Sequence, residues 1–212
     1  MFYLKKQLTI YLLLTLIFTV QTGKLYAQAM YAEYHVAMHR VVPLSEDSPF
    51  YGLIDIPVEI ELKYMVSADA NYLYVKGKTL SVSTPDSVTA HGSDSTIIID
   101  RKSGIIYFPD EKQYKRIVEY ELIGNSLKDS CFVGKVSGFD DTFLVTTCPG
   151  IPVIISPGIL FGNLKNGIQK VEAPNYNITL SKFNTIPDIL DFSSYFQHID
   201  PDTIKAEYRF FE

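Results

Sequence analysis

Alternation of apolar and polar side chains at every second residue is the feature that most constrains this chain. Residues 58–64 read Val-Glu-Ile-Glu-Leu-Lys-Tyr, so a strand here buries one face and leaves charges on the other. Residues 33–38 alternate in the same way. Turn-forming residues recur about every 8 to 12 residues, a spacing typical of all-β domains. We therefore predict a mainly β fold, built as a single curved antiparallel sheet or open half-barrel.

Further strands are predicted along the rest of the chain. One hairpin is expected to turn at 76–78 between strands 72–75 and 79–82, and another at 100–103 between strands 96–99 and 104–108. The other predicted strands cover residues 117–123, 131–136, 143–147, 153–155, 176–180 and 206–211. Only two short helices are expected, at 158–164 and 187–196. Because no linker interrupts this pattern, residues 30–212 are predicted to form a single domain, with 43–57 as a long early loop.

The N-terminus has the layout of a secretory signal peptide. Lys5 and Lys6 precede an apolar run of 13 residues, 8–20, and the small-residue pattern Ala27-Gln28-Ala29 follows. An uncleaved anchor is the alternative, but the run is shorter than the about 20 residues that a membrane-spanning helix needs. We expect 1–27 to be the signal peptide, with cleavage after Ala27 or Ala29. The mature chain then has no transmembrane span and is exported, to the periplasm or as a secreted protein.

Loss of the signal peptide makes the chain more acidic. Three of the 19 basic side chains lie in 1–27, so 16 remain against 24 acidic ones, a net charge of −8. An acidic exported protein is a poor partner for nucleic acid or for anionic lipid surfaces. The expected partner is an apolar small molecule or another envelope protein, and not nucleic acid.

The two cysteines are predicted to form a disulfide across one hairpin. If Phe139 and Asp140 form a two-residue loop, Cys131 faces Cys148 on the opposite strand. Counting outward from the loop makes them a non-hydrogen-bonded pair, whose Cα atoms approach to about 4.5 Å, within reach of disulfide geometry. Two buried free thiols are the alternative, but export and the even number of cysteines favour the disulfide.

No familiar catalytic, nucleotide-binding or metal-binding motif occurs in the sequence. The Gly-x-Gly-x-x-Gly, Gly-x-Ser-x-Gly, His-Glu-x-x-His and Cys-x-x-Cys patterns are all absent. His35 and His39 lie about 13 Å apart if they stand on a strand, too far to share a metal ion. His91 lies in a turn-like Gly/Ser/Asp cluster, and the acidic pairs at 46–47, 140–141 and 200/202 also fall in predicted turns. We therefore expect no catalytic residue, cofactor or metal site.

Aromatic residues recur on neighbouring predicted strands and are the best candidates for a binding surface. Ligand pockets are mostly apolar and aromatic, so these side chains are candidates to line a cavity for an apolar ligand. Cross-strand packing on a curved sheet is the alternative explanation. The candidate lining residues are Tyr72, Tyr74, Tyr107, Phe108 and Tyr120, with Tyr114 close by.

The stretch 131–183 has the layout of a known family. Cys131 and its hairpin lead to Cys148-Pro149-Gly150-Ile151-Pro152, then to Ser156-Pro157-Gly158, Phe161 and the block 163–168, Asn-Leu-Lys-Asn-Gly-Ile. This stretch resembles the GLPGLI family of exported Gram-negative envelope proteins, with Leu164 and Ile168 at the Leu and Ile positions of the motif. The Gly and Pro of the motif are replaced, and the Trp usual in the preceding strand is absent. The resemblance implies an exported, β-rich envelope protein with no catalytic residues to carry over.

Three functions from different classes fit these observations. The first is a non-catalytic exported protein whose concave sheet face takes an apolar ligand, a lipid moiety or a protein segment. The second is a hydrolase of unfamiliar type that uses His91 or an acidic turn pair. The third is a small outer-membrane β-barrel, in which Glu59, Glu61 and Lys63 face a lumen. Because no catalytic motif is present, we favour the first.

Overall fold

The computed structural model describes residues 29–43, 55–85, 87–89, 94–139, 142–156, 164–187 and 189–209. The predicted signal peptide, His91, the acidic pairs at 46–47 and 140–141 and residues 158–163 of one predicted helix lie outside this part of the chain. None of the described helices has the length and apolar content needed to cross a membrane.

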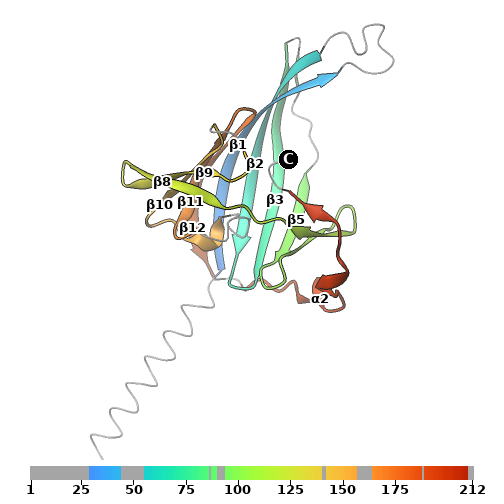
Figure 1. The fold of residues 1–212 in the computed structure, drawn as a ribbon. Helices are drawn as coiled ribbons and strands as arrows, with labels where there is room; N and C mark the ends of the chain where they lie inside the picture. The colour runs from blue at the N-terminus through green and yellow to red at the C-terminus, as the bar shows by residue number, and fades with distance from the viewer. Residues whose placement is uncertain are drawn as a thin grey trace, which may run out of the picture.

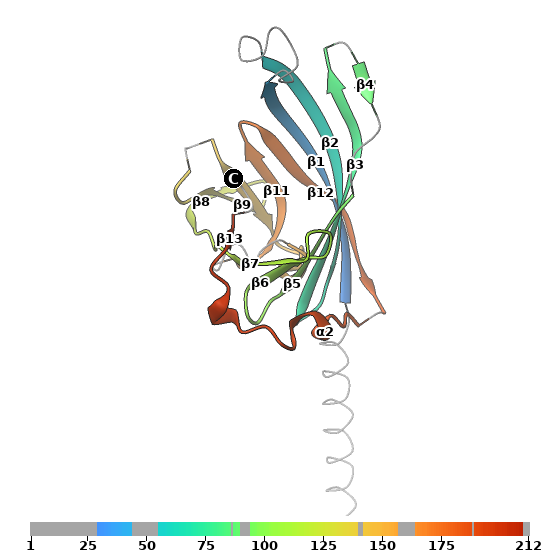
Figure 2. The ribbon, with the colours of Figure 1, turned by 90° about the vertical axis from the view of Figure 1, so that its right-hand side faces the viewer.

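One open sheet of thirteen strands dominates the described residues, and all but one of its strand pairs are antiparallel. The strand order is β13-β7-β6-β5-β3-β2-β1-β12-β11-β10-β9-β8, with β4 beside β3. The sheet curls, so that both of its ends lie on the same side of the long strands (Figure 1 and Figure 2). This confirms the predicted curved, mainly β architecture. The strands are β1 (Ala29–Pro43), β2 (Asp55–Ala68), β3 (Tyr72–Thr84), β4 (Ser87–Thr89), β5 (Ser95–Asp100), β6 (Ile105–Phe108), β7 (Gln113–Ile117), β8 (Leu122–Lys128), β9 (Cys131–Val136), β10 (Leu144–Cys148), β11 (Gly167–Ala173), β12 (Tyr176–Ile186) and β13 (Glu207–Tyr208).

The alternation along β1, β2 and β3 decides which side of the sheet faces inward. On β1, Tyr34 and Val36 are buried whereas His35 between them is exposed. The buried side is the concave one, because there residues from distant strands share one core, such as Ile106 of β6 and Val145 of β10. Glu59, Glu61 and Lys63 lie on the opposite, convex side by the same alternation.

The predicted turn at 76–78 is wrong, because β3 continues through it from Tyr72 to Thr84. Gly77 suggested a turn, but here its missing side chain allows close packing. A Cβ at this position would lie 2.6 Å from Ser95 Oγ and 3.0 Å from the Tyr64 ring. The glycine thus marks a close approach of side chains from β2 and β5 within a continuous strand.

Three other predicted elements need correction. Residues 117–123 are not one strand, because the chain must leave β7 at Ile117 to reach β8 at the far end of the sheet. Residues 153–155 form a 3-10 helix, η1 (Val153–Ile155), held by a bond from Ser156 N to Val153 O of 3.0 Å. The helix predicted over 187–196 is only α2 (Ser193–Phe196), and Leu190 before it donates its backbone N–H to the Asp69 side chain. A second 3-10 helix, η3 (Pro201–Thr203), precedes β13. The hairpin at 100–103 is confirmed.

The disulfide between Cys131 and Cys148 is present as predicted. β9 and β10 pair in the expected register, in which Thr147 lies opposite Phe132. The Cα atoms of the two cysteines are 4.4 Å apart, the close approach expected of a non-hydrogen-bonded pair. The disulfide links β9 to β10, and β9 pairs in turn with β8, the last strand in the strand order.

Replacing both cysteines by serine should lower the free energy of unfolding by about 3 kcal/mol, because the bond closes a loop between residues 17 positions apart. Urea unfolding of wild type and Cys131→Ser/Cys148→Ser, followed by circular dichroism, measures the difference. Mass spectrometry of native, unreduced protein should find neither thiol open to alkylation. Alkylation of both cysteines would contradict the bond.

A charged cluster on the convex side ties β1 to both of its neighbours. Glu33 is only 9% exposed, and its carboxylate lies 2.7 Å from Lys63 Nζ of β2 and 3.1 Å from Lys182 Nζ of β12. The Tyr31 hydroxyl donates to the same carboxylate at 2.7 Å. The bond from Lys63, followed by that from Tyr31, lowers the pKa of Glu33 from 4.5 to about 2. The cluster therefore favours the ionised carboxylate in the folded protein.

Because the pKa of Glu33 is lower in the folded than in the unfolded chain, its stabilising effect is complete above about pH 4.5 and is lost as the pH falls toward about 2. Glu33→Gln should therefore be less stable than wild type at pH 7, and this difference should shrink between pH 4.5 and 2. Chemical denaturation over that range measures it. Glu59→Gln, which changes an exposed carboxylate on the same side, is the control. A difference that stays constant down to pH 2 would refute this role of Glu33.

Candidate functional site

A pocket of about 200 Å³ lies on the concave side of the sheet. Its lining comes from β2, β3, β5, β6 and β13 and from the turn between β6 and β7. Aromatic rings and aliphatic side chains form most of its wall, whereas polar groups and two carboxylates complete it. The lining residues are Tyr64, Val75, Ser95, Thr96, Ile97, Phe108, Asp110, Glu111 and Tyr208.

Strand pairing explains why these side chains meet. Val75 of β3 lies opposite Ile97 of β5, so two aliphatic side chains stand together on the concave side. Tyr64 of β2 lies opposite Gly77 of β3, where the missing side chain leaves room for the tyrosine ring. A larger residue in place of Gly77 would push Tyr64 away from the neighbouring strand.

Phe108 makes two contacts that characterise the chemistry of the pocket. Its ring lies 5.2 Å from the Tyr208 ring in an edge-to-face arrangement, and Lys115 Nζ lies 4.9 Å from its centroid. Burial raises the pKa of Tyr208 to about 12 and also raises the pKa of Tyr64. Both phenols are neutral near pH 7, as an ordinary tyrosine is, and the raised pKa keeps them neutral at higher pH as well. The pocket offers ring faces and neutral hydroxyl groups to a ligand.

The C-terminal segment, residues 189–209, brings Tyr208 to the pocket from the convex side. Phe192 stacks on Tyr74 at 5.6 Å between ring centroids and meets Tyr72 edge-on at 5.9 Å. From α2 the segment runs around the end of the sheet to β13, as Figure 2 shows. There β13 pairs with β7, and Val118 N donates to Tyr208 O at 3.1 Å.

Asp69 anchors the start of this C-terminal segment. Its side chain is nearly buried, in the turn between β2 and β3, and accepts bonds from the backbone N of Asn71 and Tyr72 at 2.7 Å each. Its other oxygen accepts from Leu190 N at 3.2 Å. One carboxylate thus fixes both the turn and the segment that delivers Tyr208.

The five aromatic residues proposed from the sequence lie on two sides of the sheet. Tyr72, Tyr74 and Tyr107 are on the convex side under the C-terminal segment, and the Tyr107 ring lies 5.1 Å from that of Tyr195. Phe108 lines the concave pocket. Tyr120 packs against the core on the concave side, 5.5 Å from the Phe139 ring.

Of the nine lining residues only Phe108 was proposed from the sequence, and the two missed aromatic residues are Tyr64 and Tyr208. The alternation over 58–64 places Tyr64 on the apolar side of its strand, so this residue could have been found. Tyr208 belongs to a strand of two residues, whose pairing with β7 no local pattern signals.

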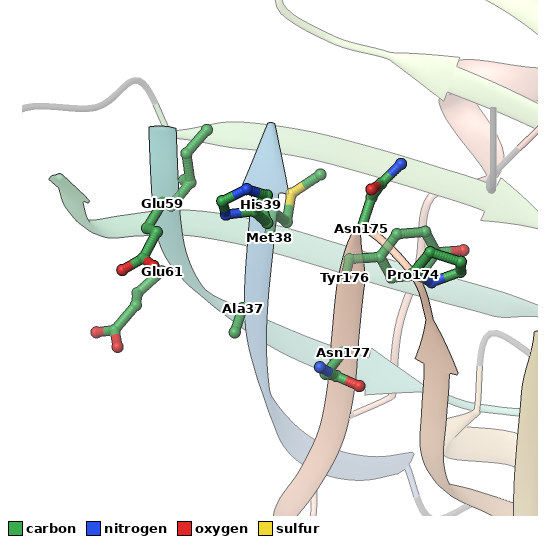
Figure 3. A pocket seen from close by; sticks show the side chains of 10 residues that line it. Ala37, Met38, His39, Glu59, Glu61, Pro174, Asn175, Tyr176 and Asn177 are labelled. Carbon is green, nitrogen blue, oxygen red and sulfur yellow. The ribbon is translucent and has the colours of Figure 1, made fainter. Parts of the chain in front are cut away.

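A second hollow, of about 290 Å³, lies where β12 begins beside β1. Figure 3 shows His39 between Glu59 and Glu61 of β2 on one side and Asn175 on the other. His39 N donates to Asn175 O at 2.7 Å, which closes the end of the pairing between the two strands. Within the described residues, no three His, Cys, Asp or Glu side chains are placed to hold a metal ion. This hollow has fewer aromatic walls than the concave pocket.

The acidic pair at 200/202 caps a helical turn. Asp200 Oδ1 accepts from Asp202 N at 3.1 Å, the capping bond of η3. Asp202 lies 3.7 Å from Arg116 at the protein surface. The pair is therefore explained by local structure.

No protein-family model matches this chain, and no curated protein matches it.

The change Phe192→Ala should release the C-terminal segment, including β13, while the long strands β1 to β3 stay folded. The ring contacts both Tyr72 and Tyr74, and each such aromatic pair contributes about 0.5–1.5 kcal/mol beyond simple burial. Hydrogen exchange with mass spectrometry should show faster exchange over 189–209, with β1 to β3 protected as in wild type. Ile189→Ala, a change at a side chain that is 71% exposed, should leave exchange unaltered. Equal protection of 189–209 in Phe192→Ala and wild type would argue against this anchor.

Proposed function

We propose that this protein is an exported, non-catalytic envelope protein that binds the apolar part of a ligand in the concave pocket. The observation that carries the proposal is the pocket wall, where the rings of Tyr64, Phe108 and Tyr208 stand beside Val75 and Ile97. Apolar hollows with a few placed polar groups are typical of small-molecule sites.

The size of the pocket restricts what can enter it. A volume of about 200 Å³ is smaller than the roughly 300–1,000 Å³ of pockets that enclose a drug-sized ligand. The pocket therefore suits one apolar end of a longer molecule, such as the chain of a lipid moiety or a side chain of a protein segment. The rest of that molecule lies outside it, on the open side of the sheet.

Three features support export to the periplasm or the cell exterior. The N-terminal 27 residues have the layout of a signal peptide. The disulfide between Cys131 and Cys148 is of the kind that persists in oxidising compartments. The stretch 131–183 resembles the GLPGLI family of exported envelope proteins.

Binding of the neutral dye Nile red tests the pocket. Wild type should shift its emission to the blue, and Phe108→Ala should weaken binding about tenfold because an aromatic wall of the site is lost. Ser95→Phe, which adds bulk at an exposed lining position, should weaken it as well. Phe183→Ala removes an exposed ring outside the pocket and is the matched control. If both pocket variants fold and bind the dye as wild type does, the proposed site is wrong.

A further inference from the structure

We infer that the concave pocket recognises an amphiphile with a cationic head, that is, an ammonium group carried on an alkyl chain. This inference rests on the proposed function and adds the chemical class of the ligand. The alkyl chain occupies the apolar wall around Val75 and Ile97, and the ammonium group lies at the rim beside Asp110 and Glu111.

The charge of the lining is the first support for this inference. Of the nine lining residues, two carry carboxylates and none carries a positive charge. Both carboxylates, Asp110 and Glu111, are exposed, and neither pairs with a lysine or arginine among the described residues. Other acidic residues do have such partners, for example Glu33 with Lys63. The residues that line the pocket thus carry a net negative charge, and no ion pair with a described residue holds either carboxylate.

The aromatic wall is the second and independent support. Lys115 Nζ already lies 4.9 Å from the centroid of the Phe108 ring, so the protein itself places an ammonium group against this wall. A cation over a ring face is attracted by about 0.5–2 kcal/mol, more when water is excluded. The rings of Tyr208 and Tyr64 add further aromatic surface in the same pocket. A ligand cation therefore finds both ring faces and carboxylates there.

The combination favours a cation over the other head groups that an amphiphile can carry. An anionic head would meet Asp110 and Glu111 as like charges. An amphiphile with a neutral head would gain binding free energy from the apolar wall but none from the two carboxylates. Lys115 competes with a ligand for the Phe108 ring, so its removal should improve binding of a cation specifically.

Three probes with the same ten-carbon chain separate these cases: decyltrimethylammonium, decanoate and decanol, each used below its micelle-forming concentration. Displacement of bound Nile red at low salt measures their relative affinities. We expect decyltrimethylammonium to bind at least about tenfold more tightly than the other two, with a preference that falls as salt is added.

Variants then locate the origin of the preference. Asp110→Asn/Glu111→Gln should abolish the preference for the cation while leaving decanol binding unchanged, and Lys115→Met should strengthen cation binding alone. Glu59→Gln/Glu61→Gln removes the same charge elsewhere and should have no effect. If no probe binds, the proposed function itself fails. If all three bind equally, the pocket stands but the inference is overturned, as it is if the preference survives in Asp110→Asn/Glu111→Gln.

Discussion

A sheet with one apolar side must bury that side, and this requirement sets the shape of the whole molecule. The alternation along β1, β2 and β3 produces a long apolar surface. The described residues supply neither a second sheet nor a long helix to cover it, since α2 has only four residues. The sheet instead curls onto itself. As a result β7 and β8, near opposite ends of the strand order, are joined by residues 118–121 alone.

Three hydrogen bonds from buried or half-buried side chains hold η1 and the residues next to it in place. The fully buried Ser156 accepts from Ile168 N at 2.7 Å, and the Tyr34 hydroxyl donates to Ile168 O at 3.4 Å. Burial raises the pKa of Tyr34 far above its ordinary value, so this hydroxyl stays a donor. From the turn between β5 and β6, Arg101 donates to Ile154 O. These bonds connect η1 and Ser156 to β11 on one side and to the turn between β5 and β6 on the other. They reduce the free-energy penalty of burying the polar groups involved.

The sequence predicts those features that depend on counting residues within one hairpin or along one strand. The pairing of Cys131 with Cys148 follows from the register of a single hairpin, and the inward face of β1 follows from alternation. The predictions failed where a residue makes its decisive contact with a part of the chain that is distant in sequence. Gly77 looks like a turn residue but makes room for Tyr64, and the aromatic side chains of Tyr72 and Tyr74 meet Phe192, which lies far along the chain. No pattern among neighbouring residues in the sequence predicts these contacts.

The same distant contact links the convex side of the sheet to the candidate site on the concave side. Phe192 and Asp69 hold the start of the C-terminal segment, and the end of that segment supplies the ring of Tyr208 to the pocket wall. β13 pairs with β7 over only two residues, and the bonds from Arg116 N to Ala206 O and from Val118 N to Tyr208 O add to this pairing. Tyr72 and Tyr74, which the sequence suggested as ligand contacts, pack against Phe192 at the start of that segment. A ligand that contacts Tyr208 would in turn stabilise the C-terminal segment against the convex side of the sheet.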